Sequence, residues 1–374
     1  MKVVIIGAGA VGSVIASELS KEEFISEIIC GAYDLKEARR FISDNAKVKI
    51  MKLDASKVSE VVNVCEGARL IINASLPDFN ENIMEAALTV GANYQDLCSH
   101  LKDFKTAEQL KYNQRFKDAK LIGLINTGVA PGITNLLARR ISDKFDELDD
   151  VKIRLIEDLD SKEMIMSWSP EVILDELTAS PLAYKNGSFV FSKPFGDSEI
   201  YEFPNIGLKR LVNLYGDEVA TLPLYLRLKN LDFKSGGSEM DVAVELYNSG
   251  KLSTLSNVKV PSPQEMDEML SKGLINNAIF VSTVEGTGKK SNEKMMIKKT
   301  VIYPDLRQIS KKLKGATYIS YPTGIAAAAF SKIIPHLSNF GVFPPEALNT
   351  EFQNAVLSDL EKQGISVISQ TFKA

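Results

Sequence analysis

Short apolar runs alternate with helical patterns along the first third of the chain. Residues 2–6 form a β-branched run that ends at a glycine, and residues 11–19 follow with helical spacing of their apolar positions. This beginning predicts a strand, a tight turn and a helix. The same alternation predicts strands at 27–30, 48–53, 70–74, 94–96 and 120–125, with helices at 35–42, after 54, at 82–90 and at 103–115. Parallel strands need such helical crossovers, so residues 1–127 are expected to form a doubly wound α/β domain.

The pattern changes after residue 127. Longer strands are expected at 151–157, 188–191, 279–285 and 295–303, joined by hairpins and a few helices. These strands predict an α+β domain over residues 128–320, built on a mostly antiparallel sheet. Helical spacing returns at 322–334, so the segment 321–374 is expected to be helical and to pack back on the N-terminal domain.

Bulk composition narrows the class of protein. The chain has 374 residues, enough for two domains with a ligand cleft between them. Its net charge of −4 argues against a nucleic-acid partner, which needs a long basic surface. Cys30, Cys65 and Cys98 show no paired spacing, so a reducing, cytoplasmic setting is expected. No apolar run has the length of a membrane span, so no membrane association is expected.

Some chemistries find no support in the sequence. No group of His, Cys and Asp residues has the spacing of metal ligands, and no serine lies in a nucleophile elbow. The stretch from Gly286 to Lys290 lacks the spacing of a phosphate-binding loop and lies between two expected strands. It is predicted to be a hairpin turn.

Three glycines lie between the first strand and the first helix. Gly7, Gly9 and Gly12 form a G-x-G-x-x-G pattern, with Ala10 and Val11 at its last two variable positions. The first glycine makes the turn, the second lets a pyrophosphate approach the backbone, and the third lets helix and strand pack closely. The free N–H groups of the helix start then face the phosphates. With several βα units behind it, the pattern predicts a site for NAD or NADP; the alternative is a glycine-rich turn without a nucleotide.

The choice between the two cofactors depends on the end of the second strand. Ala32 lies where an acidic residue usually binds the ribose hydroxyls, and Tyr33 and Asp34 follow it. Without that acid, a basic residue among 36–40 could bind a 2′-phosphate, whereas an inward Asp34 would favour NAD. Asp54, after the third strand, is expected to bind the adenine amine or to cap the next helix. The sequence leaves both choices open.

Further candidate residues follow the fourth and fifth strands, at the sheet edge where ligands bind. The segment Ala74-Ser75-Leu76-Pro77 is a candidate cofactor contact, with a plain strand-to-helix turn as the alternative. Asp96 ends the fifth strand and His100 lies just beyond it, and both are candidate catalytic residues. For Asp96 the alternative role is to cap a helix or brace a loop.

Eight motifs occur together along nearly the whole chain. They are the glycine pattern, Ala74-Ser-Leu-Pro77, Tyr94-Gln-Asp96, Gly128-Val-Ala-Pro-Gly132-Ile-Thr-Asn135, Trp168-Ser-Pro170 with Glu176 and Thr178, Asn186-Gly187, Thr323-Gly324, and Gly341-Val-Phe-Pro-Pro-Glu346. In combination they resemble the saccharopine dehydrogenase-like family, and within it the lysine 6-dehydrogenase branch. The resemblance implies hydride transfer between a nicotinamide and a carbon that bears nitrogen. In the lysine branch, the ε-amine carbon is oxidised to an imine, which hydrolyses to the semialdehyde.

The resemblance also implies which residues meet the ligands. Gly128 is expected beside the cofactor. The expected substrate contacts are Asn126, Pro131, Gly132, Asn135, Trp168, Ser169, Arg227 and Thr323. Ser169 is expected to be the N-cap of a helix that begins at Pro170. The chain departs from the lysine branch where Asn126 replaces an aspartate and where Ala179 and Leu182 replace arginines, which removes expected anchors for an amino acid's carboxylate and α-amine.

The leading prediction is an NAD(P)-dependent dehydrogenase that acts on the C–N bond of a lysine-like amino acid or amine. One alternative is an imine reductase of the saccharopine or carboxynorspermidine type, and another is a nucleotide-binding protein without activity. An ammonium group cannot release a hydride from its carbon, so a base or a desolvated pocket is required. A homodimer formed through the sheet of the second domain is also expected.

Overall fold

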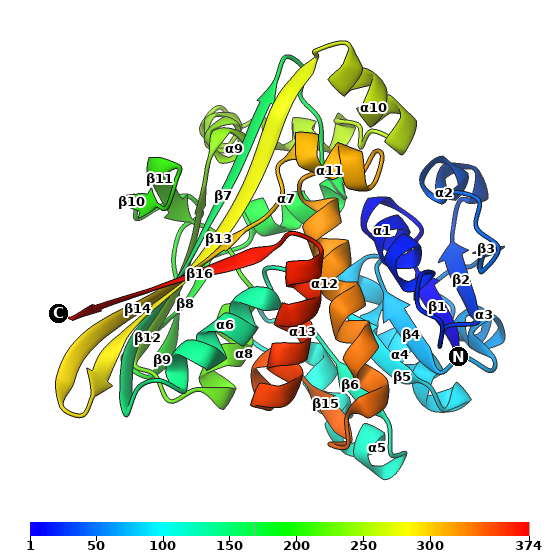
Figure 1. Ribbon diagram of the computed structural model, residues 1–374, viewed down its shortest axis with the longest axis horizontal. Helices are drawn as coiled ribbons and strands as arrows, with labels where there is room; N and C mark the ends of the chain where they lie inside the picture. Colours follow the sequence, from blue (N-terminus) through cyan, green and yellow to red (C-terminus); the bar gives the residue numbers. More distant parts are fainter. Residues whose placement is uncertain (168, 374) are drawn as a thin grey trace.

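The computed structural model describes residues 1–167 and 169–373, which form two β-sheets with α12 between them (Figure 1). The first sheet holds seven parallel strands in the order β15-β6-β5-β4-β1-β2-β3. Its strands are β1 (Lys2–Ile6), β2 (Glu27–Ala32), β3 (Val48–Lys52), β4 (Leu70–Asn73), β5 (Asn93–Asp96), β6 (Ile122–Leu124) and β15 (Gly341–Phe343). The strand order reverses between β1 and β4, and ligands bind at the carboxyl ends of strands beside such a reversal.

Helices connect these strands, as the alternating pattern predicts. They are α1 (Ala10–Leu19), α2 (Leu35–Phe41), α3 (Val58–Cys65), α4 (Asn80–Val90) and α5 (Asn113–Asp118), with short 3-10 turns η1 (Pro77–Phe79) and η2 (Glu108–Tyr112). The core strand β1 is fully enclosed, because Val3, Val4 and Ile5 have no exposed surface. Strands buried on both faces are typical of a parallel sheet covered by helices. The predicted doubly wound α/β fold is confirmed.

The second sheet is mixed, with the path β10-β11-β12-β7-β13-β14-β16 and a hairpin of β8 and β9 beside β12. Its strands are β7 (Glu147–Ser161), β8 (Leu182–Lys185), β9 (Ser188–Phe191), β10 (Glu199–Phe203), β11 (Gly207–Asn213), β12 (Asn230–Gly236), β13 (Ile275–Lys290), β14 (Glu293–Ile302) and β16 (Ser366–Lys373). Among the described strands of this sheet, only β12 and β7 pair in parallel, so the sheet is mostly antiparallel.

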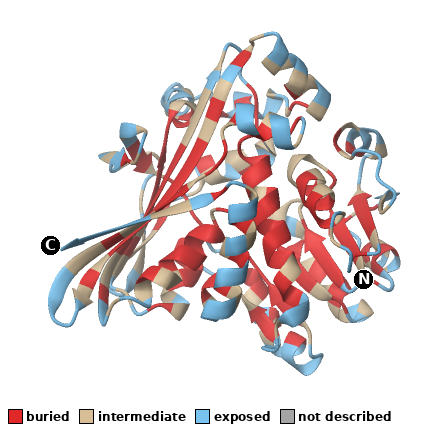
Figure 2. Cartoon of the chain, in the orientation of Figure 1, coloured by how far each residue is buried: buried red, intermediate tan, exposed pale blue. Residues whose placement is uncertain are grey.

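Helices pack around this second sheet and leave its outer hairpins exposed. They are α6 (Ile133–Ser142), α7 (Pro170–Thr178), α8 (Glu218–Tyr225), α9 (Ser238–Asn248), α10 (Pro263–Ser271) and α11 (Leu306–Lys312), with the 3-10 turn η3 (Leu252–Asn257). Figure 2 shows the buried residues concentrated in the first sheet, in α12 and in the middle of the second sheet. The core therefore lies where the two halves meet.

The helix predicted at 103–115 begins later than expected. The carboxylate of Asp103 accepts hydrogen bonds from the backbone N–H groups of Lys105 (3.1 Å) and Thr106 (2.7 Å). Such a local turn competes with helix formation. Leu101 and Phe104 also adopt positive φ angles of 46° and 59°. Residues 101–107 are therefore a loop, and helical structure starts at η2.

The hairpin predicted at Gly286–Lys290 is also misplaced. Both glycines of that stretch continue β13, which pairs with β14 as far as Lys290 opposite Glu293. Ser291 and Asn292 make the turn, with φ angles of 50° and 66°. A two-residue turn with positive φ at both positions matches the twist of a hairpin.

The chain from 321 to 373 joins both sheets. It holds α12 (Ser320–Ile333), α13 (Thr350–Lys362) and the 3-10 turns η4 (Ile334–His336) and η5 (Pro345–Ala347), with β15 in the first sheet and β16 in the second. The prediction of a purely helical segment is wrong for these two strands, because β15 has three residues and β16 is a largely exposed edge strand. α12 packs against α1, where Gly324 approaches Val14 closely. The division of the chain at 127 and 320 stays a prediction.

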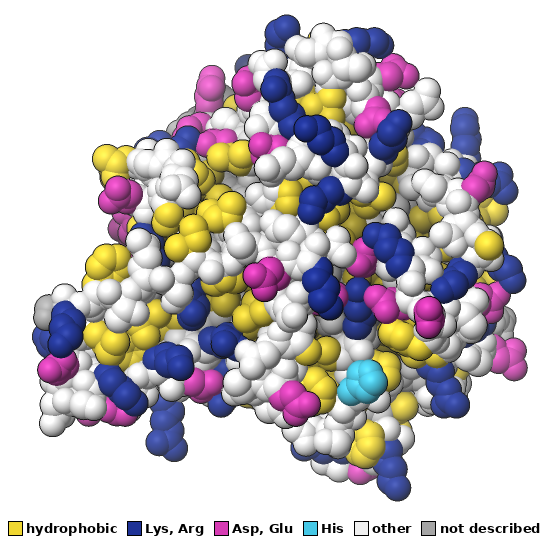
Figure 3. All heavy atoms as spheres, in the orientation of Figure 1, with side chains coloured by type: hydrophobic (Ala, Val, Ile, Leu, Met, Phe, Trp, Pro, Cys, Tyr) yellow, Lys and Arg dark blue, Asp and Glu magenta, His cyan; other side chains and the backbone are white. Residues whose placement is uncertain are grey.

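The surface carries charges of both signs. Figure 3 shows Lys and Arg side chains interspersed with Asp and Glu on one face of the molecule. Among the described residues, no helix combines the length and apolar character needed to cross a membrane, and no cluster of His, Cys, Asp and Glu is arranged to hold a metal ion.

Candidate active site

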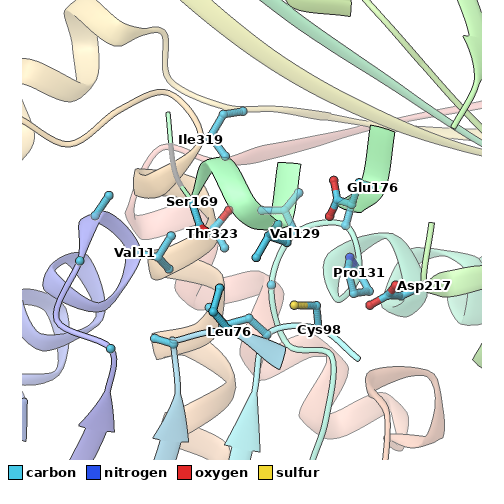
Figure 4. Close-up of a pocket in the computed structure, with 18 of the residues that line it drawn as sticks. Val11, Leu76, Cys98, Val129, Pro131, Ser169, Glu176, Asp217, Ile319 and Thr323 are labelled. Atoms are coloured by element: carbon cyan, nitrogen blue, oxygen red, sulfur yellow. The ribbon is translucent and has the colours of Figure 1, made fainter. Parts of the chain in front are cut away.

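A cleft of about 430 Å³ lies between the two halves, at the carboxyl ends of β1, β4 and β5 (Figure 4). We call it the main cavity. Its first wall follows the parallel strands and consists of Gly7, Gly9, Ala10, Val11, Ala74, Ser75, Leu76, Leu97 and Cys98. Its second wall includes Leu155, Glu157, Ser169, Val172, Glu176, Tyr215, Asp217, Phe233 and Phe280, and Gly128 to Pro131, Ile319 and Thr323 lie between the walls.

The three glycines of the first turn have different surroundings. A Cβ on Gly12 would lie 1.9 Å from the carbonyl oxygen of Gly7, and one on Gly7 would lie 2.4 Å from that of Ala74. Gly7 also has a φ of 105°, which favours glycine. A Cβ on Gly9 would meet nothing within 4 Å. Gly7 and Gly12 thus permit close packing, whereas the space beside Gly9, at the start of α1, fits a dinucleotide's pyrophosphate.

None of Ala32, Tyr33 and Asp34, the residues expected near the ribose, places a carboxylate in the main cavity. Asp34 is the N-cap of α2, and its carboxylate accepts from the N–H groups of Lys36 (2.7 Å) and Glu37 (3.1 Å), which lowers its pKa. Ala32 and Tyr33 do not line the main cavity, and Tyr33 is exposed. Glu37 is the acidic residue of this region that lines the main cavity, and its carboxylate is paired with Arg40, so this end of the site is compatible with NAD and with NADP.

Asp54 does not cap the next helix. The N-cap of α3 is Lys57, and the Asp54 carboxylate instead accepts from the N–H and the hydroxyl of Ser56. Asp54 therefore braces the turn before α3, and it lies outside the lining of the main cavity. Pro77 also lies outside this lining, where it starts η1.

The loop from Gly128 to Gly132 is held from behind by buried side chains. The Asn135 side chain accepts from the N–H of Gly132 (2.9 Å) and donates to Glu346 (3.2 Å). The Thr134 hydroxyl donates to Glu218 (2.6 Å). Two motifs far apart in sequence, which contain Asn135 and Glu346, thus meet at one contact. Pro131 lines the main cavity, whereas Gly132 and Asn135 support the loop from outside the lining.

Asp96, a predicted catalytic residue, is buried away from the main cavity. Its carboxylate accepts from the backbone N–H of Asn126 (2.7 Å) and from Gln109 (2.9 Å). Burial raises the pKa of Asp96 to about 7. These contacts connect β5 with the loop after β6, so the structure favours the bracing role. Asn126 is likewise buried, outside the lining, and its Oδ1 accepts from the Ser99 hydroxyl (2.9 Å).

His100 and Arg227 also lie outside the main cavity. The His100 ring lies beside Asp78, with 3.6 Å between Nδ1 and a carboxylate oxygen. Arg227 is exposed on the loop between α8 and β12. Neither side chain therefore reaches the cavity in which the cofactor and the substrate were expected to bind.

Thr323 and Ser169 line the main cavity as expected. Ser169 is the N-cap of α7 and Pro170 its first residue, although the Ser169 hydroxyl donates to Glu171 (2.7 Å) and makes no bond to the helix backbone. Trp168, a predicted substrate contact, lies outside the described residues.

Besides Glu37 on α2, three carboxyl groups from the second half of the molecule line the main cavity. Glu176 from α7, Asp217 before α8 and Glu157 from β7 all line it. Figure 4 shows Glu176, Pro131 and Asp217 together at one end of the cavity, with Val11 and Leu76 at the other. Burial raises the pKa of Glu176 and of Asp217 well above their usual range, and the nearby charges of Asp217 and Glu157 raise that of Glu176 further. Asp217 still accepts from the Ser99 N–H (2.8 Å).

Basic side chains are missing from this cavity. Among the described lining residues there is no Lys, Arg or His. The Tyr215 hydroxyl is buried and finds no hydrogen-bond partner in the described chain. An acidic cavity with an unsatisfied hydroxyl suits a ligand that carries positive charge and N–H donors.

The acidic residues of the main cavity were not predicted from sequence, except that Glu176 belongs to one of the family motifs. Glu176 lies four residues after Val172 on α7, and both line the cavity, so an acid on an apolar helix face is a signal. Glu157 is half-buried and directly follows the buried run 153–156 in β7. Asp217 lies directly before α8, and nothing in its local pattern distinguishes it from an ordinary helix cap.

A glycine-rich turn at the switch point of a parallel sheet, facing a second sheet across a cleft, defines a two-domain dinucleotide-binding protein. The sequence matches the saccharopine dehydrogenase NADP binding domain over residues 3–124 and the saccharopine dehydrogenase C-terminal domain over 128–365. The chain belongs to the saccharopine dehydrogenase family, a family of NAD(P)-dependent oxidoreductases. The predicted family is confirmed, and the NADP binding domain that the first match describes agrees with the predicted cofactor pair, NAD or NADP.

Two curated relatives match part of the chain. Carboxyaminopropylagmatine dehydrogenase of Synechocystis sp. is 29% identical over 236 residues, covering 59% of this chain and 58% of that protein. Carboxynorspermidine synthase of Vibrio alginolyticus is 25% identical over 259 residues, covering 63% of each. The chain thus matches less than two thirds of the length of these relatives.

Two solved structures share the fold over nearly all of the chain. Apo saccharopine dehydrogenase (L-Glu forming) from Saccharomyces cerevisiae has a TM-score of 0.73 at 13% identity and covers 99% of both chains. Homospermidine synthase from Legionella pneumophila, in complex with NAD, has a TM-score of 0.73 at 12% identity, covering 100% of this chain and 91% of that one. At these identities the likeness extends to the fold alone.

Proposed function

We propose that this chain is an NAD(P)-dependent oxidoreductase that forms a secondary amine by reducing an imine, or oxidises such an amine in reverse, with a substrate that carries several amino groups. The observation that carries the proposal is the acidic lining of the main cavity, where Glu157, Glu176 and Asp217 face the cofactor loop without a basic residue in the described lining. Buried carboxylates stabilise ammonium groups and disfavour a substrate with an excess of carboxylates.

This lining favours the imine reductase over the lysine dehydrogenase. Lysine carries an α-carboxylate that would need a cationic partner, and Arg227, the arginine expected to supply it, is exposed outside the main cavity. The relatives named carboxynorspermidine synthase and carboxyaminopropylagmatine dehydrogenase support a polyamine-like substrate. Their names also support both directions of the reaction, formation and oxidation.

The carboxyls of Glu176 and Asp217 are suited to proton exchange with the reacting nitrogen. An aldehyde and a primary amine condense to an imine with loss of water, and the imine then takes a hydride at carbon and a proton at nitrogen. A dinucleotide held at the glycine-rich turn would supply or accept that hydride. Burial raises the pKa of Glu176 and of Asp217 and so favours the protonated carboxyl, which can donate a proton to the imine nitrogen and take it back in the reverse direction. Leu76, Leu97 and Val129 make the adjoining wall apolar and limit access of water.

Consumption of NADPH and NADH tests the proposal. The purified protein is incubated with a diamine, an aldehyde without a carboxylate, or both, and lysine with oxidised cofactor is assayed in parallel. Oxidation of reduced cofactor only when amine and aldehyde are both present supports the proposal. Lysine-dependent cofactor reduction would establish the lysine dehydrogenase instead, and cofactor binding without any turnover would indicate the inactive nucleotide-binding protein.

Substitutions in α7 connect the activity to the main cavity. Glu176→Gln is expected to lower kcat by about 10²- to 10⁴-fold, the range for loss of a general acid or base. Asp175→Asn, at the exposed neighbouring position of the same helix, is the matched control and should retain activity. Equal rates for both variants would remove Glu176 from the mechanism. The homodimer and the cytoplasmic location stay predictions.

A further inference from the structure

A second cavity of about 270 Å³ adjoins the main cavity. Glu157, Glu176 and Leu214 line both cavities, so the two share a wall. Residues 161–167 and part of α9 complete the lining of the second cavity. We call it the distal cavity, because it lies beyond these shared residues when approached from the glycine-rich loop.

The polar groups of the distal cavity are mainly acidic. Glu239 from α9 lines it together with Glu157 and Glu176, whereas the one basic residue in the described lining is the exposed Lys162. Burial raises the pKa of Glu157 and of Glu239, and the charge of Glu157 raises that of Glu239 further. Carboxyl groups crowded in this way are stabilised by a bound cation.

A buried hydroxyl gives an independent indication of a ligand. Ser167 lines the distal cavity and is 3% exposed, yet its Oγ finds no hydrogen-bond partner among the described residues. A buried polar atom without a partner costs free energy unless a water or a ligand satisfies it. An N–H donor in the cavity would satisfy this hydroxyl oxygen.

The remaining lining is apolar and adaptable. Ile165, Met166 and Met240 are buried residues that line the distal cavity, and Met164 lies at its exposed side. Methionine side chains are flexible and polarisable, so they accommodate methylene chains of different shapes. Carboxylates and apolar side chains together match an alkyl chain that ends in a cation.

We propose that the distal cavity binds the far ammonium or guanidinium group of a linear polyamine whose reacting nitrogen lies in the main cavity. The inference rests on the proposed function and deepens it, because it makes Glu239 a determinant of substrate length. A chain that passes Glu157 and Glu176 would place one cationic group in each cavity. A substrate with a single amine would fill the main cavity only.

Calorimetric titration with spermidine, a linear triamine, tests the site without turnover. Glu239→Gln is expected to weaken spermidine binding roughly 10- to 100-fold, as for loss of a hydrogen bond to a charged group. Glu245→Gln removes the same charge from an exposed position of α9 and should bind spermidine as the wild type does. Val242→Trp, at the partly exposed rim, should also weaken binding by narrowing the cavity. NADPH affinity should stay unchanged in all three variants and so reports on correct folding.

The possible results separate the two proposals. The distal site would be overturned if Glu239→Gln and Glu245→Gln weakened spermidine binding equally. It would also be overturned if Glu239→Gln and Val242→Trp both left spermidine binding unchanged. Absence of spermidine binding to the wild-type protein would overturn it as well. If spermidine binding depends on Glu239 but no pair of amine and aldehyde leads to consumption of NADPH, the distal site is retained and the proposed function is rejected. If the enzyme turns over amine and aldehyde at the same rate with and without Glu239→Gln, the proposed function is retained and the distal site is rejected.

Discussion

At the scale of single residues, the three glycines of the first turn serve two different purposes, close packing within the protein and the approach of the cofactor. Gly12 and Gly7 are needed for packing within the protein, because a side chain on either would overlap a carbonyl oxygen. Gly9 is not needed for packing, and its open surroundings are explained by a ligand that approaches the backbone. Folding and cofactor binding therefore depend on different glycines.

This difference predicts opposite behaviour for two alanine substitutions. Gly9→Ala should change the free energy of unfolding by less than about 0.5 kcal/mol, since Gly9 has extended backbone angles and free space. It should weaken NADPH binding roughly ten-fold or more, because the Cβ occupies the approach to the pyrophosphate. Gly12→Ala should lose about 1–3 kcal/mol of stability through overpacking. Urea denaturation and fluorescence titration with NADPH measure both, and unimpaired cofactor binding by Gly9→Ala would contradict the assignment.

Residue patterns indicated the cofactor side of the site better than the catalytic side. Gly7 to Val11 without Ala8, the Ala74–Leu76 segment and Gly128 line the main cavity, because strand ends and loop motifs fix the backbone there; of the expected substrate contacts, Pro131, Ser169 and Thr323 line it as well. Asp96 and His100 do not line it, since a position near a strand end does not determine which way a side chain points. Asp217 and Glu157 come from the second domain, whose pairing with the first involves contacts between residues distant in sequence.

At the scale of elements, α12 connects the cofactor domain with the cleft. Ile319 lies directly before α12 and Thr323 on its first turns, and both line the main cavity. The small residues of this helix let it approach α1 closely. The strong helical spacing of 322–334 made α12 predictable, whereas the loop at 101–107 was not, because local hydrogen bonds of Asp103 compete with the helical pattern there.

Gly324 provides a test of this helix contact. A Cβ on Gly324 would lie 2.5 Å from the Cβ of Val14 on α1. Gly324→Ala should therefore destabilise the protein by about 1–3 kcal/mol, although alanine is favoured over glycine in a helix by about 1 kcal/mol. The displaced helix should also raise KM for the reduced cofactor. Thermal and urea denaturation measure the stability, and a variant more stable than the wild type would show that the helices separate without cost.

At the scale of the whole molecule, buried carboxyl groups collect where the two halves meet. Glu218 and Glu346 hold the loop that lines the main cavity, and Glu176 and Asp217 face into the cavity itself. Each group carries a desolvation cost when ionised. The alternation of strands and helices predicted the first domain and the longer strands predicted the second, but these patterns contain no information on which acidic residues the contact between the domains buries. These acids make the junction sensitive to pH.

Glu346 allows this sensitivity to be measured. Burial raises its pKa from 4.5 to about 7 in the folded protein, so its proton is bound more tightly when the chain is folded. Its stabilising contribution is complete below the unfolded pKa and is lost as the pH rises through about 7. Glu346→Gln should therefore gain stability relative to the wild type between about pH 5.5 and about pH 8, by on the order of 1–3 kcal/mol. Urea denaturation across this range measures the difference, with Glu361→Gln on the exposed end of α13 as the control. A difference that does not vary with pH, or one that the control reproduces, would show that Glu346 titrates like an exposed carboxyl.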